Sequence, residues 1–462
     1  MEKLLLIGIN TRELVNSASK LKNYLTFSVS YFKTADFKEV YKENHVVKQK
    51  PNQSCGFFEE NFDSKELLEL SKEYLEEVDQ IVLSTGLTPT DFKGKYRKYK
   101  KKIIGNKDTS TVENKYKFYK KIKNEFLTPK TYKLKHGNID EIVEILKQYE
   151  DKSFILKPIQ GSGGYGVKLI NSNGNNPHGT NFNEKNSNGK NPNKQNHLTH
   201  ILEKKEEQNY ENCGYIVQEF IEGINISSSL LATKNQAKNI MSSMQLSEAN
   251  FTIENSFKYI GNILPLDDCI LKYNTNSYKK KIIKKKKMSQ VNENNKFNEI
   301  NKVNENNKVN GKNKFNEINE ISKNLIQKFN LLGSNGVDMI IDADNNENIY
   351  VIEVNPRFQG TYETIEKLLN INLLEAHIKA CEGTLIDIPK LEPNKYSIKR
   401  IIYSKERVKV GNLNIKNVSD VPYKGVIIEK NQPLATIVTN PGKFNEVKNE
   451  VKIAIENINN NL

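Results

Sequence analysis

Three oxygen-bearing side chains stand in two segments that are typical of neighbouring β-strands. Asp338 lies in an apolar run over residues 336–342, and Glu353 and Asn355 lie in the run 349–357, after an acidic, Asn-rich turn. Because side chains alternate faces along a strand, Glu353 and Asn355 share a face, and antiparallel pairing can bring Asp338 beside them. Two carboxylates and an amide oxygen suit Mg²⁺ (or Mn²⁺), which proteins usually hold together with nucleotide phosphates. The alternative is a salt-bridged hairpin on a sheet surface.

A fixed positive charge follows on the same face. Arg357 stands two residues after Asn355, and its guanidinium can reach the same anions. Carboxylates spaced so regularly on an otherwise apolar face repel one another unless a cation lies between them. The hairpin is therefore predicted to bind anions through a divalent cation.

A Gly-rich turn provides a second candidate for anion binding. It lies between two apolar β runs, and Lys157 stands at the end of the first run. Closely spaced glycines and a serine let backbone N–H groups approach a phosphate without interference from a Cβ atom. The predicted cradle consists of Gly161, Ser162, Gly163, Gly164 and Gly166. The turn joins two strands, so it differs from a P-loop and from a dinucleotide-binding fold. A plain β-turn is the alternative, but a cation directly before the loop favours a polyphosphate.

A third segment, residues 215–223, reads as an apolar strand that passes into a short turn. Its backbone groups could pair with the edge of an adenine ring. An ordinary strand with a turn explains the same pattern, so this segment alone does not decide between the two.

The N-terminal region is predicted to form a parallel α/β layer. The expected elements are strands at 4–9 and 80–86 and helices at 11–23 and 66–78. Ligands favour the carboxyl ends of parallel strands, and Asn10, Arg12, Thr85 and Gly86 lie at those ends. For Arg12, a substrate contact and a surface ion pair both remain open.

The 462-residue chain is only 36% hydrophobic, and the shortfall is local. Two Asn-rich stretches, 171–209 and 272–320, are predicted to be disordered insertions. The second contains a six-residue repeat of the type KFNEIN, but its copies are too few to bury the core of a β-helix. The remaining chain is long enough for a sizeable core.

Several classes of protein are disfavoured by composition. The apolar runs are too short for a transmembrane helix or a signal segment, and four scattered cysteines suggest neither a zinc site nor a disulfide framework. We therefore expect a cytoplasmic protein without a membrane partner.

Residues 91–135 hold 16 basic and 4 acidic side chains, and residues 272–287 hold eight lysines. A solvated tether is the preferred interpretation of the Lys-rich run, with non-specific nucleic-acid attraction as the alternative; no specific nucleic-acid partner is expected.

Together, these segments resemble the ATP-grasp superfamily. Lys157 with its Gly-rich loop, then residues 218–223, then Asp338 with residues 353–357 occur in the order found in that superfamily. The segments 8–12 and 84–89 resemble an archaeal branch described as predicted ATP-dependent carboligases related to biotin carboxylase. The resemblance implies an α/β protein with α+β catalytic lobes. It divides the chain into a Rossmann-like domain at 1–105, an ATP-grasp domain at 106–390 and a small β-rich C-terminal lobe at 391–462. An independent accessory domain is the alternative for the last of these.

The resemblance also implies a role for individual residues. Lys157 would touch adenine and the α-phosphate, and Lys115, or as a second choice Lys107, would bind phosphates. The glycine loop would close over the β- and γ-phosphates. The hinge that pairs with adenine would be Glu219, Phe220 and Ile221, two magnesium ions would be held by Asp338, Glu353 and Asn355, and Arg357 would steady an acyl phosphate. Where the family usually has a glutamate for the ribose hydroxyls, this chain has Asn225.

The activity implied by the resemblance is that of an ATP-dependent carboxylate–amine ligase. Its substrates would be a small-molecule carboxylate and an amine, its by-products ADP and phosphate, and its assembly could be a homodimer. Residues 358–362 replace the Gln-Val-Glu-His of biotin carboxylases, and no Ala-Met-Lys-Met biotinyl site is present, so biotin carboxylation is disfavoured. A small-molecule kinase using the same site and a non-catalytic, ATP-binding regulatory protein are the alternatives.

Overall fold

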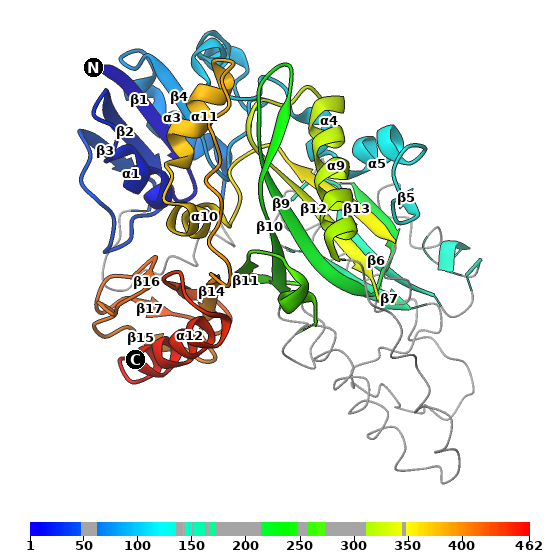
Figure 1. The fold of residues 1–462 in the computed structure, drawn as a ribbon. Helices are drawn as coiled ribbons and strands as arrows, with labels where there is room; N and C mark the ends of the chain where they lie inside the picture. The colour runs from blue at the N-terminus through cyan, green and yellow to red at the C-terminus, as the bar shows by residue number, and fades with distance from the viewer. Residues whose placement is uncertain are drawn as a thin grey trace, which may run out of the picture.

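A computed structural model describes residues 1–47, 62–134, 152–161, 166–171, 214–247, 257–272, 311–343 and 348–462, with isolated positions between 142 and 164. Within these residues, a parallel sheet, two antiparallel sheets and a two-stranded ribbon are arranged as in Figure 1.

The N-terminal layer is a four-stranded parallel sheet in the order β3-β2-β1-β4. Its elements are β1 (Glu2–Gly8), α1 (Arg12–Ala18), β2 (Tyr24–Ser30), β3 (Lys42–His45), α3 (Ser64–Leu75), β4 (Gln80–Leu83) and the 3₁₀ segment η2 (Gly94–Lys102). β1 lies between two neighbours, and Leu4 to Ile7 are fully buried, as expected for a parallel strand covered on both faces. The predicted parallel layer is confirmed, although α1 ends at Ala18 rather than near residue 23.

The middle of the chain contains two antiparallel sheets. The smaller has the order β5-β8-β6-β7, with β5 (Thr131–Lys133), β6 (Ser153–Pro158), β7 (Lys168–Asn171) and β8 (Tyr215–Glu219). The larger has eight strands in the order β13-β12-β9-β10-β11-β14-β18-β16. The first five strands of that order are β13 (Ile349–Asn355), β12 (Gly333–Asp342), β9 (Gly223–Ala232), β10 (Ala237–Ser247) and β11 (Tyr259–Leu264). The helices of this region are α4 (Ser110–Glu113), α5 (Lys115–Ile122), α9 (Gly311–Lys328), α10 (Tyr362–Leu369) and α11 (Leu373–Cys381).

The C-terminal segment completes the larger sheet. β14 (Ser397–Tyr403) pairs with β11 on one side and with β18 (Pro433–Val438) on the other, and β16 (Val418–Ser419) forms the edge. β15 (Val408–Lys409) and β17 (Ile427–Ile428) form the ribbon, and α12 (Phe444–Asn459) packs below them (Figure 1). Because main-chain hydrogen bonds run from β11 into β14, this segment is joined to the larger sheet rather than set apart from it.

The prediction that residues 272–320 form a disordered insertion is wrong for the last part of that stretch. α9 begins at Gly311 and packs against β9, β10 and β12 (Figure 1). Phe315, Ile318, Ile321 and Leu325 recur at helical spacing, and Ile318 and Leu325 are fully buried. The final repeat copy therefore supplies the apolar face of a helix. Most of the stretch 171–209 and residues 273–310 lie outside the described residues, and Asn171 ends β7.

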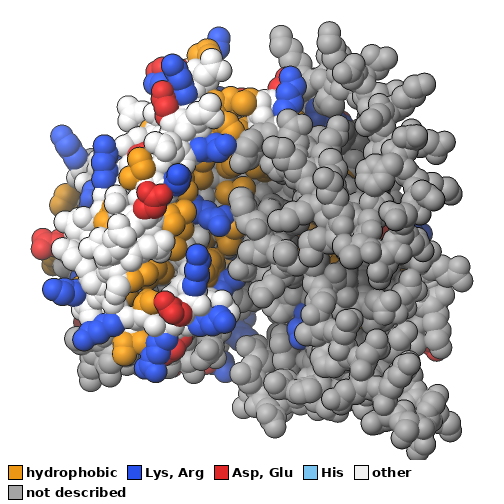
Figure 2. Space-filling view, turned by 90° about the horizontal axis from the view of Figure 1, so that it is seen from below, with side chains coloured by type: hydrophobic (Ala, Val, Ile, Leu, Met, Phe, Trp, Pro, Cys, Tyr) orange, Lys and Arg blue, Asp and Glu red, His pale blue; other side chains and the backbone are white. Residues whose placement is uncertain are grey.

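The described surface shows no concentration of one charge in the view of Figure 2. Lys and Arg side chains are spread between acidic and hydrophobic side chains there. Among the described helices, none has the length and apolar character required to cross a membrane.

Candidate active site

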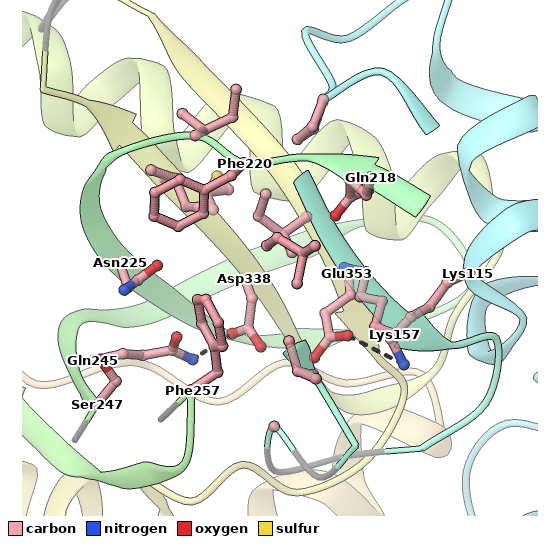
Figure 3. A pocket seen from close by; sticks show the side chains of 18 of the residues that line it. Lys115, Lys157, Gln218, Phe220, Asn225, Gln245, Ser247, Phe257, Asp338 and Glu353 are labelled. Atoms are coloured by element: carbon pink, nitrogen blue, oxygen red, sulfur yellow. Dashed lines mark hydrogen bonds and ion pairs between the residues drawn. The ribbon is translucent and has the colours of Figure 1, made fainter. Parts of the chain in front are cut away.

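The β12–β13 hairpin brings the three predicted oxygen ligands together. Asp338 and Glu353 are direct cross-strand partners, and Asn355 stands opposite Gly336. The Asn355 amide donates to Asp338 Oδ2 at 2.9 Å. Gln245 of β10 donates to Asp338 Oδ1 at 2.9 Å, as Figure 3 shows. The structure thus shows the juxtaposition that strand alternation predicts, with Gln245 as an additional partner.

The two carboxylates have opposite electrostatic surroundings. Burial raises the pKa of Asp338 to about 7, and the nearby Glu353 charge adds to the rise. Burial also acts to raise the pKa of Glu353, but Lys115, Lys157 and Arg357 outweigh it and the pKa is lowered. Desolvation and like charge both disfavour ionisation, so the pKa of Asp338 is raised whereas the three cations near Glu353 lower the pKa of that residue.

Two lysines face Glu353 from different elements. Lys115, the first residue of α5, lies with Nζ 3.6 Å from Glu353 Oε2 and donates to the Gly161 carbonyl oxygen at 2.8 Å. Lys157, near the end of β6, is buried, and burial lowers its pKa to about 8 although Glu353 opposes this effect (Figure 3). Lys107, the second choice for the phosphate-binding lysine, instead donates to the carbonyl oxygens of Lys101 and Ile103.

The glycine turn approaches other backbone closely. Gly164 has φ +80°, and a Cβ atom there would lie 2.2 Å from the Phe257 carbonyl oxygen, which only glycine tolerates. Gly161 and Gly166 also have positive φ. Ser162 and Gly163 lie outside the described residues, so the turn is described at Gly161, Gly164 and Gly166.

A cavity of about 210 Å³ separates the two antiparallel sheets. The segment Glu219, Phe220 and Ile221, between β8 and β9, lines it together with both lysines and the two carboxylates. Among the described residues, no backbone–backbone hydrogen bond outside helices and strands involves Ile221, so its N–H and C=O are available to a planar ligand.

The end of this cavity opposite the lysines is polar. Asn225 of β9 lines it with Gln245, Ser247 and Phe257 (Figure 3). The polar residues Ser243, Gln245 and Ser247 alternate along β10, a period of two that could have indicated a second functional strand in the sequence.

A second cavity, of about 530 Å³, adjoins the first and shares Lys115, Gly161 and Glu353 with it. Asn355 and Arg357 line this second cavity, as do Thr85 and Gly86 from the end of β4. The Arg357 turn is held by Gln359, whose amide donates to the carbonyl oxygens of Asn355 at 3.2 Å and of Arg357 at 2.6 Å. A Cβ atom on Gly336 would lie 2.1 Å from the Gln359 side chain, so a larger residue there would displace the amide that holds the Arg357 turn.

Arg12 lines neither cavity, and the ion pair expected for it is present but buried rather than at the surface. It is 1% exposed, and its guanidinium pairs with Asp420 at 2.7 Å and with Glu363 at 2.8 Å. Asn10 likewise donates to Asp420. The two acids come from the C-terminal segment and α10, so Arg12 joins three parts of the fold internally.

The ATP-grasp domain family matches residues 112–285 and 280–361, more than half of the chain. The chain belongs to the ATP-grasp family. An uncharacterized protein of the archaeon Methanocaldococcus jannaschii is 29% identical over 443 residues, which cover 94% of this chain and 88% of that protein.

Solved ATP-grasp structures have the same fold. The biotin carboxylase domain of Hydrogenobacter thermophilus 2-oxoglutarate carboxylase, crystallised with MgADP and bicarbonate, has a TM-score of 0.64 and 12% identity over 98% of this chain and 89% of that chain. Aspergillus clavatus N5-carboxyaminoimidazole synthase, in complex with ADP and 5-aminoimidazole ribonucleotide, has a TM-score of 0.60 and 13% identity over 99% of each chain. The expected ATP-grasp fold is confirmed by these likenesses.

Proposed function

We propose that this ATP-grasp protein is an ATP-dependent ligase that activates a substrate carboxylate as an acyl phosphate and joins it to an amine. ADP and phosphate are the by-products. The observation that carries the proposal is the cluster of Asp338, Glu353 and Asn355, faced by Lys115 and Lys157 where the two cavities meet. Complexes of similar folds with ADP or MgADP support it.

The cluster fits Mg²⁺ or Mn²⁺. Asn355 uses its Nδ2 to donate to Asp338, which leaves its Oδ1 as a ligand beside the two carboxylates. With two carboxylates and one amide oxygen, the cluster suits a cation that takes its remaining ligands from phosphates and water. When bound, the cation would neutralise phosphate charge and polarise the transferred phosphoryl group.

The first cavity is proposed to hold the nucleotide. Adenine would pair with the backbone of Glu219 and Ile221, beside Phe220, and Asn225 would reach the ribose hydroxyls. Lys115, Lys157 and the turn at Gly161, Gly164 and Gly166 would contact the phosphates. A buried lysine and backbone N–H groups interact strongly with a polyphosphate because little water screens them.

Two displacements complete the reaction. A carboxylate oxygen attacks the γ-phosphorus, and ADP leaves; Arg357, at the shared end of the cavities, stabilises the charge that develops on the phosphoryl oxygens. The neutral amine nitrogen then attacks the carbonyl carbon, the bond from that carbon to the bridging oxygen breaks, and phosphate leaves with the proton that the nitrogen gives up. This sequence requires no nucleophilic side chain.

The test is a screen of carboxylate and amine pools for phosphate release, followed by isotope transfer. With an ¹⁸O-labelled carboxylate, the bridging oxygen leaves with phosphate, so ¹⁸O-phosphate is expected. Arg357→Ala should reduce turnover about a hundredfold or more, on the scale found when one oxyanion-stabilising group is removed. The matched control is Arg407→Ala, since Arg407 is exposed and pairs with Glu429.

Other outcomes identify other functions. A phosphorylated product without phosphate release would favour the kinase, and MgATP binding without turnover would favour the regulatory protein. Full turnover by Arg357→Ala would disprove the catalytic role. The dimer of the Hydrogenobacter domain supports the proposal of a homodimer, which light scattering tests.

A further inference from the structure

The second cavity has a polar composition that changes along its length. At the end shared with the nucleotide cavity it presents Lys115, Asn355 and Arg357. Its lining also includes the acidic side chains of Asp91 and Glu113, which are not among the described residues that line the nucleotide cavity. The cavity therefore has one end suited to phosphate and another suited to positive charge.

The acidic side chains are held by neutral donors. Glu113, at the end of α4, accepts from the Thr109 hydroxyl at 2.7 Å. Asp91 accepts from the Thr88 N–H at 2.8 Å and the Thr88 hydroxyl at 3.0 Å. Within the described ranges, the ion pairs that the chain forms include neither carboxylate. The protein orients both carboxylates, and Arg357 is a cation whose charge acts on Glu113.

The position of Glu113 connects the two ends. Burial raises the pKa of Glu113, Arg357 acts to lower it and Asp91 acts to raise it, so the carboxylate lies within electrostatic reach of both. An amine bound at Glu113 would therefore stand close to the guanidinium proposed to face the reacting phosphate, and a nitrogen that has given its proton to Glu113 is neutral beside that guanidinium.

The walls between these ends are partly apolar. Leu83 and Leu87 come from the N-terminal layer. Val112 comes from α4, and Phe358 comes from the segment after β13. A bare metal ion is a poor fit to such a cavity, because Mg²⁺ and Ca²⁺ need several oxygen ligands at short distance and no three-carboxylate group occurs among the described residues. An organic cation fits better, since it has an apolar body as well as a charge.

We propose that this cavity binds the amine substrate, which enters with its nitrogen protonated against Glu113 and Asp91 and its aliphatic or aromatic body along Leu83, Leu87 and Phe358. The Glu113 carboxylate then takes one proton, which leaves the nitrogen neutral for attack. This inference rests on the proposed ligase function, because it assigns one of the two substrates of that reaction. It specifies the substrate class as a primary amine with an apolar body.

Isothermal titration of the full chain with hexylamine, 1-hexanol and hexanoate, in the presence of MgADP, tests the proposal. Charge-assisted hydrogen bonds contribute enough for hexylamine to bind at least about tenfold more tightly than the neutral alcohol. Glu113→Gln and Asp91→Asn should each remove most of this preference. Glu320→Gln and Asp387→Asn are matched controls, because these exposed acids pair with Lys323 and Lys238 outside both cavities.

Each outcome bears on one proposal or the other. Equal affinity of the wild-type protein for hexylamine and hexanol, or no binding of either, would overturn the amine site. A preference for hexylamine that survives in both Glu113→Gln and Asp91→Asn would also overturn it. Thermal unfolding at the wild-type temperature verifies that Glu113→Gln and Asp91→Asn are folded. If hexylamine is preferred but MgADP produces no binding heat, the amine site stands and the ligase proposal fails.

Discussion

Replacing Asp338 by asparagine should stabilise the ligand-free protein while abolishing its activity. Asp338 is a proposed metal ligand whose pKa burial raises to about 7, with Glu353 adding to the rise. Asparagine keeps the shape and removes the charge. Its amide can still accept from Gln245 or Asn355, the two neighbours that donate to Asp338.

The size of the effect follows from the pKa. An ordinary aspartate titrates at 3.8, and the difference from about 7 corresponds to roughly 4 kcal/mol of destabilisation when the group is ionised. A less favourable hydrogen bond in the variant costs about 1–2 kcal/mol, so a net gain of roughly 2 kcal/mol is expected. Because the folded-state pKa of this acid is raised, the destabilisation is full above about pH 7 and disappears as the pH falls toward about 4.

Thermal unfolding at pH 8 and pH 5, without nucleotide, provides the assay. Asp338→Asn should melt a few degrees above wild type at pH 8, and the difference should shrink at pH 5. Asp387→Asn, on an exposed side chain, should change neither melting temperature. A variant that melts below wild type at pH 8 and still turns over ATP would refute the reasoning about both charge and metal.

Three further substitutions test other contacts. Lys157→Met should weaken MgADP binding about tenfold or more in calorimetry, because it removes a buried cation; an unchanged Kd would exclude a phosphate contact. Gly164→Ala should raise the KM for ATP severalfold, since its Cβ would meet the Phe257 carbonyl oxygen at 2.2 Å, whereas Gly383→Ala, also at positive φ but with open space around it, should not. Arg12→Met should destabilise the fold by roughly 3–5 kcal/mol, because it leaves the acids that paired with Arg12 without their cation; lost activity at unchanged stability would instead favour a substrate contact.

Strands with strongly apolar sequences could be predicted, and weakly patterned ones could not. The runs at 336–342 and 349–355 became β12 and β13 because alternation and β-branched content agree there. β3 consists of Lys-Glu-Asn-His, and only its pairing with β2 makes it a strand. In α9, an Asn-rich composition obscured a helical spacing of apolar residues.

The site could be predicted where its residues are close in sequence. Asp338, Glu353 and Asn355 lie on one hairpin, so strand alternation alone places them together. The ion pairs of Arg12 join it to residues about 350 and 400 positions away, and no local pattern reveals such partners. The same is true of the second cavity, whose walls come from β4, α4 and the segment after β13.

The pairing of β11 with β14 has a consequence for how the chain reaches its native state. During synthesis, β11 leaves the ribosome before β14. Until the C-terminal strands follow, the edge of β11 that pairs with β14 has unpaired N–H and C=O groups. Such an edge is a template for association between chains. A shortened gene product ending near residue 390 would keep that edge permanently open, and we expect it to accumulate in inclusion bodies instead of yielding a smaller working enzyme.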